Sequence, residues 1–68
     1  MKTFDKYKRN LKYDETGVYS YNTKVADIRD NRIVQRKWYS MTTQKHIRYA
    51  AKELGLILIE VNKNGQFR

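Results

Sequence analysis

Residues 39–55 read YSMTTQKHIRYAAKELG, and they predict the single helix around which the rest of the fold is arranged. The apolar residues of this stretch recur at helical spacing and form one stripe, which consists of Ile47, Ala50, Ala51 and Leu54. Thr42 or Thr43 is the predicted N-cap, since a Thr hydroxyl can accept a bond from an unpaired backbone N–H. Gly55 suits the left-handed position that ends many helices. The helix is therefore predicted over about 43–54.

The residues before this helix predict a β-hairpin over about 18–39. Its first arm alternates between two faces, and one face is expected to carry Tyr19, Tyr21, Thr23 and Val25. The apolar set then changes phase, which predicts a bulge or a break near residues 24–26. Asp30 and Asn31 form the predicted turn, and residues 32–39 form the second arm.

Three further segments complete the predicted fold. The apolar run at about 56–61 indicates a buried central strand. Residues 14–17 predict a turn, in which Gly17 supplies a positive φ. Residues 10–13 suit a short edge strand or weak helical structure. The sequence thus predicts an α+β domain, with a small antiparallel sheet of three or four strands covered on one face by one helix.

The chain of 68 residues is predicted to hold one domain, over residues 10–62. Residues 1–9 read as a basic, flexible arm or equally as a frayed terminus. The cations of this N-terminal region are Lys2, Lys6, Lys8, Arg9 and Lys12. Residues 63–68 are predicted to form a tail.

The residue counts exclude several kinds of site. The chain has no Cys and one His, so disulfides, thiolate chemistry and a zinc site built from its own side chains are excluded. No paired carboxylates or glycine-rich phosphate loop are present, and no cofactor, metal or catalytic constellation is predicted. Domains this small often gain stability by association, so a homodimer is one expected state.

No apolar run approaches the roughly 20 residues that span a bilayer, and no signal peptide is visible. The sequence therefore predicts no membrane partner and a cytoplasmic location, which is that of the host cell if a phage encodes the chain.

The charge balance of 15 Lys and Arg against 7 Asp and Glu gives a net charge of +8. A field of this size attracts phosphate backbones, anionic surfaces or acidic proteins. A solvated surface without a specific partner is the plainer alternative.

Two sequence blocks resemble a family of small, uncharacterised phage-type proteins. The first block, at residues 21–26, has the pattern Tyr-x-Thr-x-Val-Ala. The second, at residues 38–54, has an aromatic residue followed by Ser-x-Thr-Thr-x-Lys-His-x-x-Tyr-x-Ala-x-Glu-Leu. The resemblance covers roughly residues 18–60. It implies a virus or provirus origin and, by association, nucleic-acid binding or inhibition of a host protein.

Cations and aromatic residues interleave along the predicted hairpin and helix. Arg and Lys neutralise phosphates, and flat rings can stack on unpaired bases. The candidate nucleic-acid-binding residues are Arg29, Arg32, Arg36, Lys37, Thr43, Lys45, His46, Arg48, Tyr49 and Lys52.

Some of these side chains have structural alternatives. Trp38 is expected in the core, because large rings dominate small cores. Tyr49 lies opposite the apolar stripe and is the expected exposed ring. Thr43, with Lys45 and His46, could contact a phosphate at the helix N-terminus, although helix capping is the commoner use. His46 flanks the stripe, where a polar surface role is expected.

The leading functional hypothesis is a nucleic-acid-binding module whose hairpin and helix cations form one surface. The alternative is an inhibitor or modulator that binds a host protein, which suits the small size and the basic charge. The third is a small ribonuclease with His46 as a general acid or base. Because no second base or oriented partner is visible, the protein is expected not to be an enzyme.

Overall fold

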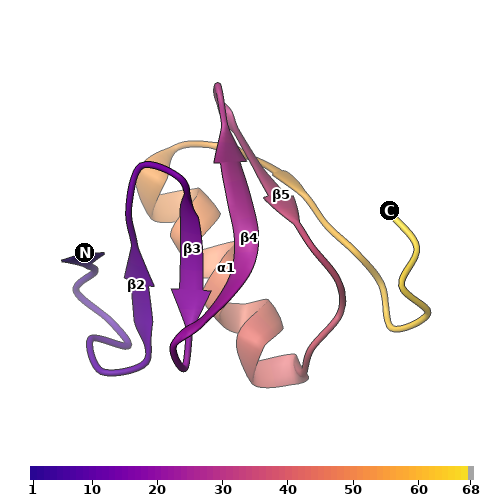
Figure 1. The fold of residues 1–68 in the computed structure, drawn as a ribbon, viewed down its shortest axis with the longest axis horizontal. Helices are drawn as coiled ribbons and strands as arrows, with labels where there is room; N and C mark the ends of the chain where they lie inside the picture. Colours follow the sequence, from indigo (N-terminus) through magenta and orange to yellow (C-terminus); the bar gives the residue numbers. More distant parts are fainter. Residues whose placement is uncertain (68) are drawn as a thin grey trace.

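A computed structural model describes residues 1–67, which form a six-stranded sheet with one helix packed on one of its faces (Figure 1). The strands are β1 (Lys2–Thr3), β2 (Leu11–Tyr13), β3 (Gly17–Ser20), β4 (Thr23–Arg29), β5 (Arg32–Gln35) and β6 (Ile57–Ile59). The helix, α1 (Met41–Leu54), connects β5 to β6. The predicted α+β class and the helix-covered sheet are confirmed. The prediction of three or four strands is wrong.

The strands lie in the sheet in the same order as in the sequence. All neighbours are antiparallel except β5 and β6, which are parallel because the chain crosses over through α1 before it returns to the sheet. The predicted purely antiparallel sheet is therefore wrong at its last pair. The strand predicted at 56–61 is also not central, since β6 is a three-residue edge strand whose Ile57 is 53% exposed.

The predicted first arm of the hairpin contains two strands instead of one. β3 ends at Ser20, and Tyr21 and Asn22 form a two-residue turn with φ values of 52° and 69°. Positive φ at both turn positions is typical of the tight turns that suit the twist of a hairpin. The predicted second arm is shorter than expected, because β5 ends at Gln35. The predicted turn at residues 30–31 is confirmed.

The predicted phase change near residues 24–26 is a β-bulge. Val18 pairs with Ala26 while Tyr19 pairs with Lys24, so Val25 is the extra residue in β4. Val25 and Ala26 are both buried, at 1% and 0% exposure. The bulge therefore lets two consecutive residues enter the core, whereas strict alternation would place one of them on the opposite face.

The turn at residues 14–17 is confirmed, but Gly17 has a different role from the predicted one. Asp14 Oδ1 accepts hydrogen bonds from the backbone N–H groups of Thr16 and Gly17, at 2.8 and 3.0 Å. Gly17 itself begins β3, and positive φ occurs instead at the glycines Gly55 and Gly65. A Cβ atom on Gly17 would lie 2.4 Å from the carbonyl oxygen of Ala26. Close approach of two strands, and not a positive φ, requires glycine here.

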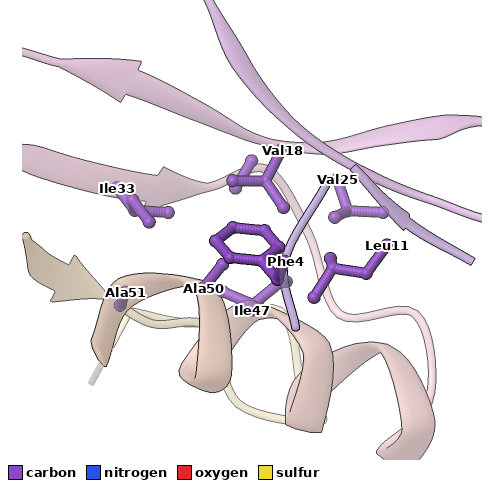
Figure 2. Close-up of a cluster of buried hydrophobic side chains, with 9 residues drawn as sticks. Phe4, Leu11, Val18, Val25, Ile33, Ile47, Ala50 and Ala51 are labelled. Atoms are coloured by element: carbon purple, nitrogen blue, oxygen red, sulfur yellow. The ribbon is translucent and has the colours of Figure 1, made fainter. Parts of the chain in front are cut away.

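The core lies between the sheet and α1 (Figure 2). Figure 2 shows Val18, Val25 and Ile33 of the sheet above the ring of Phe4 and Leu11 beside it, with the helix side chains below. The buried core residues are Phe4, Leu11, Val18, Val25, Ala26, Ile33, Ile47, Ala50 and Ala51. Phe4 belongs to the predicted basic arm, yet it is only 7% exposed. The arm also contains β1, which precedes Phe4 and pairs with β2. The first residues of the chain are thus built into the sheet and the core.

The helix begins earlier than predicted. Its N-cap is Ser40, whose hydroxyl accepts a hydrogen bond from the Thr43 backbone N–H at 3.1 Å. The predicted cap at Thr42 or Thr43 is therefore wrong, although the left-handed C-cap at Gly55 is confirmed, with φ of 67°. Within residues 1–67, no helix is long and apolar enough to cross a membrane.

The predicted tail turns back on residues 61–62, which follow β6. Asn62 Oδ1 accepts hydrogen bonds from the backbone N–H groups of Asn64 and Gln66, and Val61 bridges to Phe67. Arg68, the last residue of the predicted tail, lies outside the described residues.

Candidate nucleic-acid interface

The sheet has one face that the helix leaves uncovered, which we call the open face. In Figure 1, α1 lies behind the strands, so the view is onto this face. Side chains alternate along each strand, and two directly paired residues lie on the same face of the sheet. Residues that alternate with the core residues and pair with one another therefore point away from α1. The residues on the open face are Thr3, Lys12, Gly17, Tyr19, Lys24, Asp27, Arg29, Arg32, Val34, Ile57 and Ile59.

One row of paired residues crosses three strands of the open face. Lys12 pairs directly with Tyr19, and Tyr19 pairs directly with Lys24. Directly paired side chains have Cβ atoms about 5 Å apart, so the tyrosine ring lies between two lysines. The Tyr19 hydroxyl lies 3.5 Å from Thr16 Oγ1, which orients the ring toward the preceding turn.

A second cationic pair lies at the other end of the open face. Arg29 of β4 pairs with Arg32 of β5, and both side chains are exposed. Arg32 in turn pairs with Ile57 of β6. Strand pairing therefore places two arginines next to each other, at the turn that joins β4 and β5.

Asp27 lies between the lysine–tyrosine row and the arginine pair. Its Oδ1 is 3.4 Å from Lys24 Nζ and 3.9 Å from Arg36 Nη1. This contact places Arg36, which follows β5, on the same face. The open face thus carries five cations against one carboxylate, with Asp30 in the adjoining turn, and its charge stays positive.

A groove of about 300 Å³ opens beside the lysine–tyrosine row. Lys12 and Tyr19 form part of its lining, together with Arg9 from the basic N-terminal region. The remaining lining residues are Met1, Asn10 and Asn22. The groove therefore combines two cations, an aromatic ring and two carboxamides.

The structure separates the predicted binding residues into three groups. Arg29, Arg32 and Arg36 lie on the open face. Lys37 lies in the loop before α1, with Nζ 5.3 Å from the centre of the Tyr39 ring. The third group is on the helix side of the sheet and consists of Thr43, Lys45, His46, Arg48, Tyr49 and Lys52. The hairpin and helix cations therefore do not form one surface.

The exposed helix cations, Lys45, Arg48 and Lys52, lie on the side of α1 that faces away from the sheet. Arg48 makes a two-pronged ion pair with Glu60, at 2.6 and 3.0 Å. Hydrogen bonding to this carboxylate raises the pKa of Arg48. Part of the positive charge on the helix is therefore neutralised locally.

Thr43 and His46 are buried between the helix and the sheet, at 5% and 2% exposure. His46 Nδ1 lies 2.9 Å from Ser20 Oγ, and burial lowers the pKa of His46. The rings of Tyr7 and Tyr21 cover the imidazole, with centroids 4.7 and 5.7 Å away. The predicted surface role of His46 and the predicted phosphate contact by Thr43 are not supported by this burial.

The two large rings also differ from their predicted positions. Tyr49 is partly buried in an aromatic cluster, with its ring 5.6 Å from Phe4 and 5.4 Å from Tyr7. Trp38, predicted in the core, is instead half-buried beside a second groove of about 390 Å³. Lys63 Nζ lies 5.9 Å from the centre of the Trp38 ring. Both rings are therefore partly buried, Tyr49 in an aromatic cluster and Trp38 at the edge of a groove.

Sequence reasoning missed Lys12, Tyr19 and Lys24 as a group. Their alignment depends on the turn at Tyr21 and Asn22, which reverses the chain after Tyr19. Asparagine tolerates positive φ, so the Tyr-Asn pair was the available signal for this turn. Among residues 1–67, no group of three or more His, Cys, Asp or Glu is placed to hold a metal ion.

Comparison with known proteins gives one match. No curated protein and no solved structure matches the chain significantly. Residues 1–59 match the profile of a family of unknown function, DUF8033. The matched residues include the whole sheet and the helix. The chain therefore belongs to the DUF8033 family.

Proposed function

We propose that this protein binds nucleic acid through the open face of its sheet. The supporting observation is the register of the strands, which aligns Lys12, Tyr19 and Lys24 in one row and pairs Arg29 with Arg32. A regular sheet holds these cations at fixed spacings, which suits the repeated charges of a phosphate backbone. Such contacts give affinity without sequence specificity.

We further propose that the role is binding and not catalysis. A ribonuclease would need a base or acid within reach of the phosphodiester. His46 is the only histidine in the chain, it is 2% exposed, and it lies on the other side of the sheet from the open face. The resemblance to small phage-type proteins supports a phage origin and action in the host cytoplasm.

Salt titration tests the proposed interface. Fluorescence anisotropy with a labelled oligonucleotide would be measured at several salt concentrations, for wild type and for the double variant Arg29→Gln/Arg32→Gln. Each lost phosphate contact is expected to reduce the slope of log K against log salt by about one. The double variant should therefore bind more weakly, with a slope smaller by about two.

The matched control is Lys45→Gln/Lys52→Gln, which removes two cations from the outer side of α1. It should bind like wild type. Equal losses in both double variants would indicate that net charge alone governs binding, and no wild-type binding at about 50 mM salt would rule out the proposal.

A host protein is the second candidate partner, supported by the groove beside Trp38. Met41 in this groove is 59% exposed, and Trp and Met are enriched at protein interfaces. A pull-down from nuclease-treated lysate with wild type and Trp38→Ala separates the two partners. A stoichiometric partner that survives nuclease and is lost in the variant would favour this candidate, whereas loss of all bound material on nuclease treatment favours nucleic acid.

A further inference from the structure

We infer that the groove beside Tyr19 accepts an unpaired nucleobase, so that the open face selects single-stranded over double-stranded nucleic acid. This inference rests on the proposed nucleic-acid function and specifies its substrate class. It follows from three features of the same small region: the ring, the flanking lysines and the carboxamides of the groove.

The first feature is the placement of the Tyr19 ring. The side chain is half-buried on a face that no described element covers, and its neighbours in the sheet are Lys12 and Lys24. An aromatic ring on such a platform can stack on any base, since every base has a flat π face. The hydroxyl contact to Thr16 orients the ring before a ligand arrives, which reduces the entropy lost on binding.

The second feature is the spacing of charge around the ring. Strand pairing places Lys12 and Lys24 on opposite sides of Tyr19, roughly 10 Å apart at their Cβ atoms. An extended single strand presents a base between two phosphates, and this order matches the lysine–tyrosine–lysine row. In a duplex the bases are stacked inside, so the ring would meet only the sugar-phosphate backbone.

The third feature is the composition of the groove. Its volume of about 300 Å³ is at the lower end of small-ligand sites, which suits a single base better than a larger ligand. Asn10 and Asn22 bring carboxamides that can donate and accept hydrogen bonds at base edges. Arg9 adds a cation at the same end, so a phosphate on that side of the base has a partner.

The test compares strand state and ring chemistry in one binding experiment. Fluorescein-labelled dT and rU oligonucleotides and a DNA duplex of equal length would be titrated with wild type, Tyr19→Leu and Tyr19→Phe. Tyr19→Leu removes the ring but keeps an apolar side chain of similar reach at an open site, so the fold should persist. Tyr7→Leu is the control, because Tyr7 is a 39% exposed ring on the helix side, where Leu keeps an apolar contact with His46.

Wild type and Tyr7→Leu should bind single strands at least tenfold more tightly than the duplex. Tyr19→Leu should lose about tenfold in single-strand affinity and nearly all of the preference. Tyr19→Phe keeps the stacking ring and loses only the Thr16 contact, so it should keep the preference and lose less affinity than Tyr19→Leu.

Equal affinity for single strands and duplex, with Tyr19→Leu unchanged, would overturn this inference. The proposed function would survive that result if Arg29→Gln/Arg32→Gln still weakened both ligands. Absence of binding to any oligonucleotide at about 50 mM salt would instead overturn the proposed function itself.

Discussion

The absence of a side chain at Gly17 allows β3 and β4 to lie close together. Its Cα faces the Ala26 carbonyl, and the Lys24 side chain crosses above it, with Cε 2.5 Å from the position of a Cβ atom. Lys24 is thereby directed toward Asp27. A single hydrogen atom in place of a side chain thus permits both the close pairing of β3 and β4 and the path of a lysine on the open face.

Gly17→Ala should destabilise the fold, because the added methyl group would lie within 3 Å of backbone that cannot easily move. Overpacking of this kind costs about 1–3 kcal/mol. Urea denaturation would measure the change in the free energy of unfolding. Gly65→Ala is the comparison, since Gly65 has a positive φ but open space around it. A smaller loss at Gly17 than at Gly65 would contradict the close-approach argument.

His46 should make the stability of the protein depend on pH. Burial lowers its pKa in the folded state, so the unfolded chain takes up a proton more readily as pH falls below about 6.5. Stability is therefore fully present above this pH and decreases as pH falls toward 5, by at most about 1.4 kcal/mol per pH unit. The pKa of Asp14 is also lowered, mainly by hydrogen bonds from Thr16. Its effect on stability falls below about pH 4, outside the pH range in which His46 titrates.

The measurement is the free energy of unfolding from pH 5 to pH 8 for wild type and His46→Gln. Only the slope with pH is compared, because the variant also alters the contact with Ser20. The slope between pH 5 and 6.5 should be reduced in His46→Gln. An unchanged slope would show that other groups carry the pH dependence.

Most features of the helix α1 could be predicted from the sequence, but its first residue could not. Its apolar stripe, its C-cap and its packing on the sheet were all predictable from 3.6-residue periodicity and Gly55. Its start was not, because three hydroxyl residues, Ser40, Thr42 and Thr43, compete for one cap position. Ser40 has the extended backbone of an N-cap, with φ of −165° and ψ of 168°, whereas Thr43 is already helical and buried.

Ser40→Ala should cost about 0.5–2 kcal/mol of stability, because the Thr43 N–H then loses its side-chain acceptor. Thr42→Ala, at an exposed position in the first turn, should change stability by no more than about 0.5 kcal/mol. Thermal unfolding followed by circular dichroism would compare the two. A larger effect at Thr42 would restore the cap position predicted from sequence.

In the strands, the alternation of apolar and polar residues revealed the bulge but not the turn between β3 and β4. The bulge at Val25 was visible as a phase change, since burial of two consecutive apolar residues leaves a mark in the sequence. The turn at Tyr21 and Asn22 left only a weak mark, an asparagine that tolerates positive φ, because the alternation of side chains continues through the turn in step. The same limit applies to the open face. Arg29 and Arg32 were each named from the sequence as binding candidates, whereas the lysine–tyrosine row depends on the turn at Tyr21 and Asn22.

At the scale of the molecule, the N-terminal segment joins the two layers. Phe4 is buried, and its ring lies 4.6 Å from Tyr13 in the sheet and 5.6 Å from Tyr49 on the helix. The Lys6 backbone N–H also donates a hydrogen bond to the Tyr49 hydroxyl at 3.3 Å. Sequence reasoning placed this segment outside the domain, because its cations outnumber its few apolar residues.

Phe4→Ala should cost about 3–5 kcal/mol, the usual range for removal of a buried ring. In a domain of 68 residues this is a large part of the total stability, so much of the variant should be unfolded at 37 °C. Urea denaturation would measure the loss, with Phe67→Ala as the matched control, because Phe67 is 61% exposed. A loss below about 1 kcal/mol would mean that the segment contributes little to the core.

The parallel pairing of β6 with β5 has a consequence for the order in which the molecule assembles. β1 to β5 form a meander whose contacts are local in sequence, so they can form early. β6 can add only after the intervening helix has closed a long loop, because its partner lies on the far side of that crossover. Acquisition of the last strand is therefore expected to be the late event in folding, and a partly folded chain would transiently display the edge of β5.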